Sequence, residues 1–387
     1  MKFTTSQIQA IEHGTGPCLV LAVPGAGKTT VLLKRLENLI ASGVDPRKIA
    51  SITFSKQQAV DMQKRFLAKV EDDPAYENYQ ANDLTFSTIH AFCYRIIRTF
   101  ANKMGSDTSL IEGSDSYNKY QVVAQIFRTI NNRYITEDEL ESFFRIDGYL
   151  KNALVDYKTF SRTFHEKFSK FEEVSRAYSE FKEKHQLIDF DDMLVRTPQI
   201  FESDEEILRS LQRRYEYLQL DEAQDTSLIQ LRIIQKIAEP ENNLFMVADD
   251  DQAIYGFRGA NPSYLLQFKE IYPQAKVILM EDNYRSSRNI VELSAHFIQT
   301  NKSRYEKIPQ TTDQEESRIQ IIIAKSLKAQ LKKITDELPA DIENGSVALL
   351  FRNNLSMISL MDELDKQNIP FSARARGQTF YQHPVLR

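Results

Sequence analysis

A loop with two glycines, a lysine and a threonine follows the first apolar run of the chain, in the segment Ala22-Val-Pro-Gly-Ala-Gly-Lys-Thr29. In such a loop the glycines let backbone N–H groups turn towards phosphate oxygens, and the next helix adds the partial charge of its N-terminus. Lys28 would reach the β and γ phosphates of a nucleotide, and Thr29 would offer a hydroxyl to Mg²⁺. Ala22 replaces the first glycine of the strict pattern, so a glycine-rich helix entry is the alternative for this segment alone.

Two carboxylates end a second apolar run far downstream, where Tyr217-Leu-Gln-Leu is followed by Asp221 and Glu222. A phosphate-binding loop needs one acid to hold Mg²⁺ and a second to activate water. We therefore predict Asp221 as the metal ligand and Glu222 as the general base. Taken alone, these residues also fit a solvated acidic turn; the lysine-bearing loop favours the catalytic interpretation.

The elements that must position these groups are short apolar runs bounded by polar or turn residues. We predict buried strands at residues 18–23, 49–54, 217–220, 244–248 and 277–280. Each is followed by polar or small residues and often by a helical pattern. This alternation predicts an α/β fold with a parallel sheet, in which ligands collect at the C-terminal ends of the strands.

The middle and the end of the chain follow other patterns. From residue 101 to residue 186, helical periodicity rich in aromatic residues replaces the strand pattern and predicts an inserted helical subdomain. After residue 283 a second alternation predicts strands near 319–324 and 347–351, and helices near 327–337 and 356–367. The predicted domains are residues 1–100 with 187–281, residues 101–186, and residues 282–387.

The composition limits the kinds of partner. With a formal net charge of -5, binding of nucleic acid must come from local basic and aromatic patches rather than from an overall positive field. Cys18 and Cys93 are the only cysteines, which excludes a disulfide framework and favours a reducing, cytoplasmic location. No apolar run approaches the roughly 20 residues of a membrane span, so we expect no membrane partner.

The phosphate loop and seven further ordered segments resemble the motifs of superfamily 1 DNA helicases of the UvrD/Rep/PcrA group. These segments are residues 3–10, 52–62, 87–92, 187–194, 218–226, 247–260 and 282–289. The most specific is Val247-Ala-Asp-Asp-Asp-Gln-Ala-Ile-Tyr-Gly-Phe-Arg-Gly-Ala260. The resemblance implies a RecA-like P-loop domain with a parallel sheet, a helical inserted subdomain and an incomplete second RecA-like domain, with ATP and Mg²⁺ as cofactors.

The resemblance also implies which residues meet the nucleotide. Gln7 would read the adenine edge, Tyr284 would stack on the adenine ring, and Gln252 would sense the γ-phosphate. Arg285 would act as an arginine finger, with an exposed surface ion pair as the alternative role. The expected ATP contacts are Gln7, Pro24, Gly25, Ala26, Gly27, Lys28, Thr29, Thr30, Tyr284 and Arg285, although Thr30 stands where many relatives carry arginine. The expected catalytic residues are Lys28, Glu222, Gln252 and Arg285.

Flat aromatic rings in these motifs suit a protein that tracks along DNA. Stacking of bases on aromatic rings tolerates any base sequence, and hydroxyl groups can bind backbone phosphates. The expected DNA contacts are Thr53, Phe54, Ser55, Thr88, His90, Tyr255, Phe257 and Arg258. Taken singly, Tyr255 and Phe257 fit a hydrophobic core equally well. The implied partners are single-stranded DNA, duplex junctions, and proteins of DNA repair or replication.

The resemblance implies an ATP-dependent helicase that moves 3′ to 5′ on single-stranded DNA and unwinds duplex. No segment resembles motifs V and VI of the family, so we expect either a fragment of a longer helicase or a shortened gene product, with weak or no unwinding by itself. Two other functions stay open. One is the helicase arm of a nuclease-helicase like RecB or AddA, and the other is a nucleotide-gated DNA-binding module without motor activity.

Overall fold

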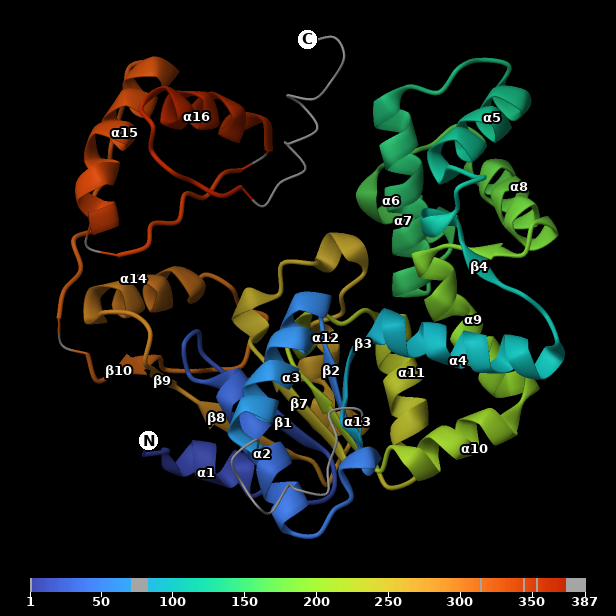
Figure 1. The fold of residues 1–387 in the computed structure, drawn as a ribbon, viewed down its shortest axis with the longest axis horizontal. Coiled ribbons are helices and arrows are strands. Elements are labelled where there is room, and N and C mark those ends of the chain that lie inside the picture. Colours follow the sequence, from blue (N-terminus) through green and yellow to red (C-terminus); the bar gives the residue numbers. More distant parts are fainter. Residues whose placement is uncertain (1, 71–82, 314, 344, 353, 374–387) are drawn as a thin grey trace. The chain divides into compact units, whose positions relative to one another are not determined.

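The computed structural model describes residues 2–70, 83–313, 315–343, 345–352 and 354–373. The chain forms two compact units, Met1–Ser317 and Arg318–Arg387, each of which is described by itself (Figure 1). The third domain expected from the sequence ends in residues 374–387, which lie outside the described residues.

A six-stranded sheet forms the centre of the first unit, with all strands parallel in the order β3-β2-β6-β7-β1-β8. Its strands are β1 (Cys18–Ala22), β2 (Ile49–Thr53), β3 (Thr85–Thr88), β6 (Tyr217–Leu220), β7 (Leu244–Ala248) and β8 (Lys276–Met280). The apolar runs predicted all of these except β3, which is an edge strand of the sequence Thr-Phe-Ser-Thr. The predicted α/β class is therefore confirmed.

Both faces of the sheet are covered, which explains why its central strands are mostly apolar. The buried Gln219 of β6 is an exception, and its Nε2 donates to the hydroxyl of Ser51 in β2 at 3.1 Å. In β1, Leu19 and Leu21 belong to one hydrophobic cluster, whereas Cys18, Val20 and Ala22 belong to the cluster on the opposite face. Both cysteines of the chain are buried and free, and burial raises the pKa of each thiol to about 12.

Helices pack on each face of this sheet (Figure 1). The Leu19 face is covered by α4 (Ile89–Met104), α9 (Phe190–Ser203), α10 (Glu205–Arg214), α11 (Leu228–Ala238), α12 (Ser263–Leu266) and α13 (Phe268–Ile271). The Cys18 face is covered by α1 (Thr5–Ile11), α2 (Lys28–Ala41) and α3 (Lys56–Val70). None of the described helices is long and apolar enough to cross a membrane.

The predicted helical insert has its own aromatic core, which includes Phe127, Phe143, Phe160 and Phe171. Its helices are α5 (Lys119–Asn131), α6 (Glu137–Ala153), α7 (Tyr157–Phe164) and α8 (Phe171–Lys184). The insert is not wholly helical, because β4 (Ser109–Leu110) pairs in parallel with β5 (Leu187–Ile188) at the point where the chain returns. This short strand was too brief to give an apolar pattern.

Buried charges join the insert to α9. Lys182 lies 2.5 Å from both Asp189 and Asp192, and only 2% of its side chain is exposed. Lys151 lies 2.7 Å from Asp147 and 3.0 Å from Asp192. We call these five residues the insert cluster. It supplies opposite charges at close range, as buried ions require.

The remaining elements of the first unit follow β8. They are β9 (Asp282–Asn283), α14 (Arg288–Ile298) and β10 (Gln310–Thr311), and the two short strands pair in parallel. The segment between α14 and β10 returns to the C-terminal end of β7, as the ion pairs of Arg304 and Lys307 described below show.

In the second unit, the two predicted helices are confirmed as α15 (Leu327–Glu343) and α16 (Asn354–Lys366), which pack through Leu338, Leu360 and Leu364. The strands predicted near 319–324 and 347–351 were wrong, since the described residues there form no strand. Ile323 is 94% exposed and Leu350 is 93% exposed. An apolar run makes a strand only when a neighbouring strand satisfies its N–H and C=O groups, and no such pairing occurs among the described residues of this unit.

Candidate functional site

The loop between β1 and α2 is shaped by two glycines in the left-handed region, Gly25 at φ +74° and Gly27 at φ +83°. Gly27 is also the N-terminal cap of α2, whose first residue is Lys28. A Cβ atom at Gly25 would lie 2.7 Å from the Cβ of Arg285, so this position requires glycine. The loop thus holds the unpaired N–H groups and positive dipole end of α2 at the C-terminal edge of the sheet.

Gln7 connects the first helix to this loop, and both the oxygen and the nitrogen of its side-chain amide form hydrogen bonds. Its Oε1 accepts from the backbone N–H of Thr4 at 2.9 Å, and its Nε2 donates to the carbonyl of Ala26 at 3.1 Å. Only 6% of Gln7 is exposed. Contact with adenine would therefore share an amide that already holds the loop. Among the other expected contacts, Pro24 is exposed at the rim and Thr30 is half-buried in the first turn of α2.

The paired acids at the end of β6 lie against Lys28 and Thr29. The hydroxyl of Thr29 donates to Oδ2 of Asp221 at 3.3 Å, and Nζ of Lys28 lies 3.7 Å from Oε2 of Glu222. Glu222 takes a left-handed backbone conformation with φ +51°, which is uncommon for a non-glycine residue. Two segments almost two hundred residues apart, which the sequence predicted to act together, therefore meet at one edge of the sheet.

The acids at this edge carry more negative charge than their surroundings compensate. Burial raises the pKa of Asp221 to about 6, and the charge of Glu222 adds to this rise while Lys28 opposes it. Burial and Glu222 also raise the pKa of Asp225 to about 7. Its Oδ1 is buried and has no hydrogen-bond partner among the described residues. A divalent cation would relieve this imbalance, and the oxygen donors of Thr29 and Asp221 suit Mg²⁺.

Sequence reasoning missed the amide that connects Glu222 to the end of β7. Gln224 donates through Nε2 to Oε2 of Glu222 at 2.8 Å, and its Oε1 accepts from the backbone N–H of Asp249 at 3.0 Å. The side chain of Asp249 in turn accepts from Nε2 of Gln252 at 2.9 Å. Both Gln224 and Asp249 lie within the recognised motifs. Their pairing could not be foreseen, because it depends on β6 and β7 being neighbours in the sheet.

Tyr284 and Arg285 lie on the opposite side of the phosphate loop. The backbone N–H of Tyr284 donates to the carbonyl of Gly25 at 3.1 Å. Oδ1 of Asn283 accepts from the backbone N–H of Arg285 at 2.7 Å and so fixes the turn. Tyr284 is 52% exposed and Arg285 is also exposed. Both side chains therefore stand beside the loop and are accessible to a ligand bound in it.

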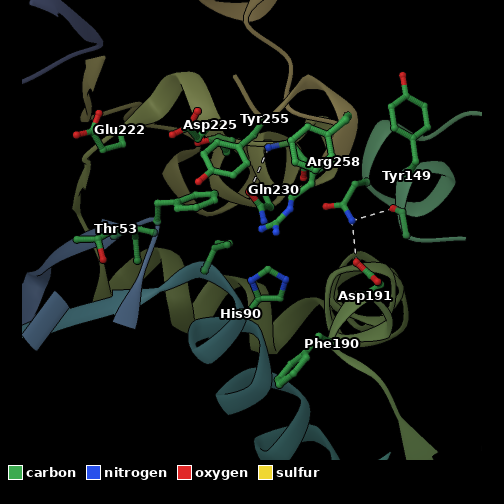
Figure 2. Close-up of a pocket in the computed structure, with 18 of the residues that line it drawn as sticks. Thr53, His90, Tyr149, Phe190, Asp191, Glu222, Asp225, Gln230, Tyr255 and Arg258 are labelled. Carbon is green, nitrogen blue, oxygen red and sulfur yellow. Dashed lines mark hydrogen bonds between the residues drawn. The ribbon is translucent and has the colours of Figure 1, made fainter. Parts of the chain in front are cut away.

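A cavity of about 610 Å³ opens beside the acids. Six of the expected DNA contacts line it: Thr53, Phe54, His90, Tyr255, Phe257 and Arg258. Figure 2 shows Tyr255 and Arg258 on one side of this cavity and His90 and Phe190 on the other, with Glu222 and Asp225 towards one end. Residues from five distant parts of the chain thus share one opening.

The aromatic residues of the cavity form a continuous surface. The rings of Phe54 and Tyr255 are 4.9 Å apart between centroids, and those of Tyr255 and Phe257 are 6.0 Å apart. The guanidinium carbon of Arg258 lies 5.3 Å from the Tyr255 centroid and 5.6 Å from the Phe257 centroid. Phe54 is 39% exposed and Phe257 is 57% exposed. Exposed rings next to a cation are suited to stacking on bases and to contact with a phosphate.

Two of the expected DNA contacts do not line the cavity. The hydroxyl of Thr88 caps α4 by accepting from the backbone N–H of Ala91 at 3.2 Å. The hydroxyl of Ser55 accepts from the backbone N–H of Gln58 at 3.2 Å at the start of α3. His90 does line the cavity, and burial lowers its pKa, which favours the neutral ring.

The opposite wall of the cavity comes from the helical insert and α9, and sequence reasoning missed it. Tyr149, Asn152, Phe190 and Asp191 line this wall, and Nδ2 of Asn152 donates to Asp191 at 2.8 Å (Figure 2). The turn of residues 255–259, which we call the aromatic turn, is in close contact with α6, because a Cβ atom at Gly259 would lie 2.8 Å from the Cβ of Asn152. Phe190 and Asp191 lie in the recognised segment 187–194, but no local motif marks Tyr149 or Asn152, and only the docking of the insert places these two residues here.

Comparisons with known proteins agree with these features. A family model for the UvrD/REP helicase N-terminal domain matches residues 3–273, and one for the UvrD-like helicase C-terminal domain matches residues 278–385. The chain is 30% identical over 393 residues to the ATP-dependent DNA helicase PcrA of Staphylococcus epidermidis, covering 99% of this chain and 52% of that protein. It is 30% identical over 389 residues to PcrA of Leuconostoc citreum, covering 98% of this chain and 50% of that protein.

These alignments include nearly every residue of the chain, which itself spans about half the length of the curated relatives it matches. The first family model alone includes the phosphate loop, the paired acids and the aromatic turn. On this evidence the chain belongs to the UvrD/REP helicase family.

Proposed function

We propose that this chain hydrolyses ATP to move 3′ to 5′ along single-stranded DNA, as the motor of a DNA helicase that opens duplex junctions. The PcrA relatives are named ATP-dependent DNA helicases, and family membership supports the same chemistry here. The direction of movement rests on the resemblance of the motifs. The preference for single-stranded DNA rests on the aromatic cavity, since stacking requires unpaired bases.

The observation that carries this proposal is the position of Glu222. This carboxylate lies 3.7 Å from the Lys28 ammonium of the phosphate loop, and it also lines the cavity that holds the aromatic residues. An acid that faces both a nucleotide and a nucleic acid can respond to both. Binding of DNA would thereby change the rate at which the same acid activates water.

In this proposal each residue of the nucleotide site has a distinct role. Lys28 and the N–H groups of α2 bind the phosphates, and Glu222 takes the proton of the attacking water. Thr29 and Asp221 would hold Mg²⁺, which supplies charge stabilisation at the transferred phosphoryl group when bound. Gln252 would respond to the γ-phosphate, and the guanidinium of Arg285 would stabilise the charge that develops on it.

A short backbone connection offers a route from ATP hydrolysis to DNA. The backbone N–H of Asn261 donates to the carbonyl of Thr226 at 3.0 Å, and Ser227 pairs with Ala260 in an isolated bridge. Thr226 follows the acids of β6, whereas Asn261 follows the aromatic turn. A shift of Glu222 between nucleotide states would therefore be passed to the rings that stack on bases.

The decisive experiment measures ATP hydrolysis by the chain with and without single-stranded DNA. Lys28→Ala and Glu222→Gln should each lower the DNA-stimulated kcat by about 100-fold or more, because each removes a group that acts in the transition state. Glu222→Gln should retain nucleotide binding better than Lys28→Ala, because it leaves the phosphate ligands in place.

A matched control is Lys34→Ala, which removes a lysine farther along the same helix whose ammonium forms an ion pair with the neighbouring Glu37. This variant should hydrolyse ATP at the wild-type rate. Unchanged turnover in Lys28→Ala or in Glu222→Gln would contradict the assigned roles. DNA binding gated by nucleotide, without any hydrolysis, would instead favour a binding module that lacks motor activity.

A further inference from the structure

A lysine outside every recognised motif is completely buried next to the nucleotide site. The side chain of Lys307 is 0% exposed, and its Nζ lies 2.7 Å from Asp249, 2.5 Å from Asp250 and 3.0 Å from Asp251. It comes from the segment between α14 and β10. Arg304, from the same segment, makes two hydrogen bonds to Asp251 at 2.6 Å and 2.8 Å.

These contacts reach the nucleotide site through Asp249. One carboxylate oxygen of Asp249 accepts from Lys307, and the other accepts from the amide of Gln252 at 2.9 Å. The backbone N–H of Asp249 donates to Gln224, whose amide holds Glu222. Asp249, which accepts a hydrogen bond from Lys307, is therefore connected to Gln252 directly and to Glu222 through Gln224.

We propose that Lys307 is a positioning residue for ATP hydrolysis, which holds Asp249 so that Gln252 and, through Gln224, Glu222 keep their catalytic orientation. This inference rests on the proposed function. It assigns a role in that function to a residue that follows Tyr284 and Arg285 in the sequence. In this proposal the segment of residues 299–309 affects the rate of hydrolysis through its ion pairs with the aspartates that follow β7.

The charges at this place explain why a lysine is needed. The oxygens of Asp249, Asp250 and Asp251 lie within 4.8 Å of one another, a grouping that could hold a metal ion. Lys307 and Arg304 instead place two positive charges against the three carboxylates. Without Lys307, burial of Asp249 would favour its neutral form, and a protonated carboxyl group no longer presents two acceptor oxygens.

The same segment also continues into the other side of the nucleotide site. It leads into β10, which pairs with β9, and β9 runs directly into the turn that carries Tyr284 and Arg285. A displacement of this segment would therefore move the arginine-finger turn and release Gln252 together. This arrangement explains why a residue far from the phosphates can affect the rate of the chemical step.

The test compares Lys307→Met with Lys182→Met in ATP hydrolysis by the whole chain. Lys182 is a matched control, since it is equally buried and is held by two carboxylates, but it belongs to the insert cluster. Lys307→Met should lower kcat by about 10- to 100-fold, the usual effect of removing a partner that orients a functional side chain. The KM for ATP should change little, because the phosphate loop is untouched. Lys182→Met should leave kcat at the wild-type value.

Two further variants separate positioning from a loss of folding. Lys307→Met combined with Asp250→Asn removes one charge of each sign and so keeps the net charge of the group, which protects the fold while leaving Asp249 without its lysine. Its kcat should stay low. Lys307→Met combined with Gln252→Ala should lower kcat by less than the product of the two single losses, because both changes act in part through Gln252.

The outcomes distinguish this inference from the proposed function. If the wild type is active and Lys307→Met does not change kcat, the inference is wrong but the proposed function stands. The same holds if Lys182→Met lowers kcat as much as Lys307→Met does. The inference is also wrong if the double variant Lys307→Met with Gln252→Ala loses kcat by the full product of the two single losses. A wild type that hydrolyses ATP no faster than Lys28→Ala would overturn the proposed function and this inference with it.

Discussion

Two groups of buried carboxylates in this protein differ in how their charge is compensated. In the insert cluster, burial alone would raise the pKa of Asp189, but Lys151 and Lys182 outweigh it and hold the pKa below its usual value. At the end of β6, burial raises the pKa of Asp221 and of Asp225, and the single Lys28 does not reverse the rise.

The difference separates a structural cluster from a functional one. Charges that the fold itself neutralises, as in the insert cluster, hold two elements together. Carboxylates left with excess negative charge make the folded protein less stable than it could be, and they are arranged for a ligand that supplies the missing positive charge. The excess negative charge at Asp221 and Asp225 fits the proposed Mg²⁺ and nucleotide site.

The largest effect that would sharpen this comparison is expected from Lys182→Met. Removing this ammonium leaves Asp189 and Asp192 buried with less compensation, and breaking a buried ion pair from one side costs about 3–5 kcal/mol. Unfolding in urea should show this loss. Lys184→Met, at an exposed position of the same helix, is the control and should change stability little. A loss in Lys182→Met no greater than in the control would break the comparison.

An intermediate effect is expected from the aromatic residues, which also divide into a buried structural group and an exposed group at the cavity. Phe143 is completely buried in the insert core, whereas Phe257 is 57% exposed at the cavity. Phe257→Ala should weaken binding of single-stranded DNA by about 1–3 kcal/mol at fixed salt, because one base loses its stacking partner. Fluorescence anisotropy with a labelled oligonucleotide would measure this loss. Tyr134→Ala, at a 72% exposed ring outside the cavity, should bind DNA like the wild type.

The smallest effect is expected from Asp225→Asn, and it should depend on pH. The folded-state pKa of Asp225 is raised to about 7, so keeping it ionised costs stability that increases as pH rises from its ordinary pKa of about 3.9. Asp225→Asn should therefore stabilise the fold by about 1 kcal/mol above pH 7, since partial exposure reduces the full effect, and by almost nothing near pH 4.

Asp189→Asn should show the opposite sign. The pKa of Asp189 is lowered in the fold, so its ionised form contributes stability above its ordinary pKa and loses that contribution as the pH falls. Thermal unfolding across this pH range would compare the two variants. If both changed stability in the same direction at pH 8, the distinction between the two groups of carboxylates would fail.

Much of the sheet could be predicted from the sequence because burial on both faces makes a strand mostly apolar. The runs ending at Ala22 and Leu220 show this, and each is followed closely by residues that we propose to carry the chemistry. The polar edge strand β3 and the two-residue strand β4 gave no such pattern. The strands expected near 319–324 and 347–351 were wrong because these segments are apolar but have no strand to pair with among the described residues.

The residue types alone indicated a nucleotide site, through a lysine in a glycine loop and two acids after a strand, and they placed aromatic rings in a nearby motif. The folded chain showed that Phe257 is exposed and which further side chains complete the site. Gln224 and Asp249 act together because β6 and β7 are neighbours, and Asn152 meets the aromatic turn because the insert docks there. Lys307 lies far along the chain from Asp249, and nothing local marks it. Hydrogen bonds and ion pairs act over a few ångströms of space, and only the folded chain fixes those distances.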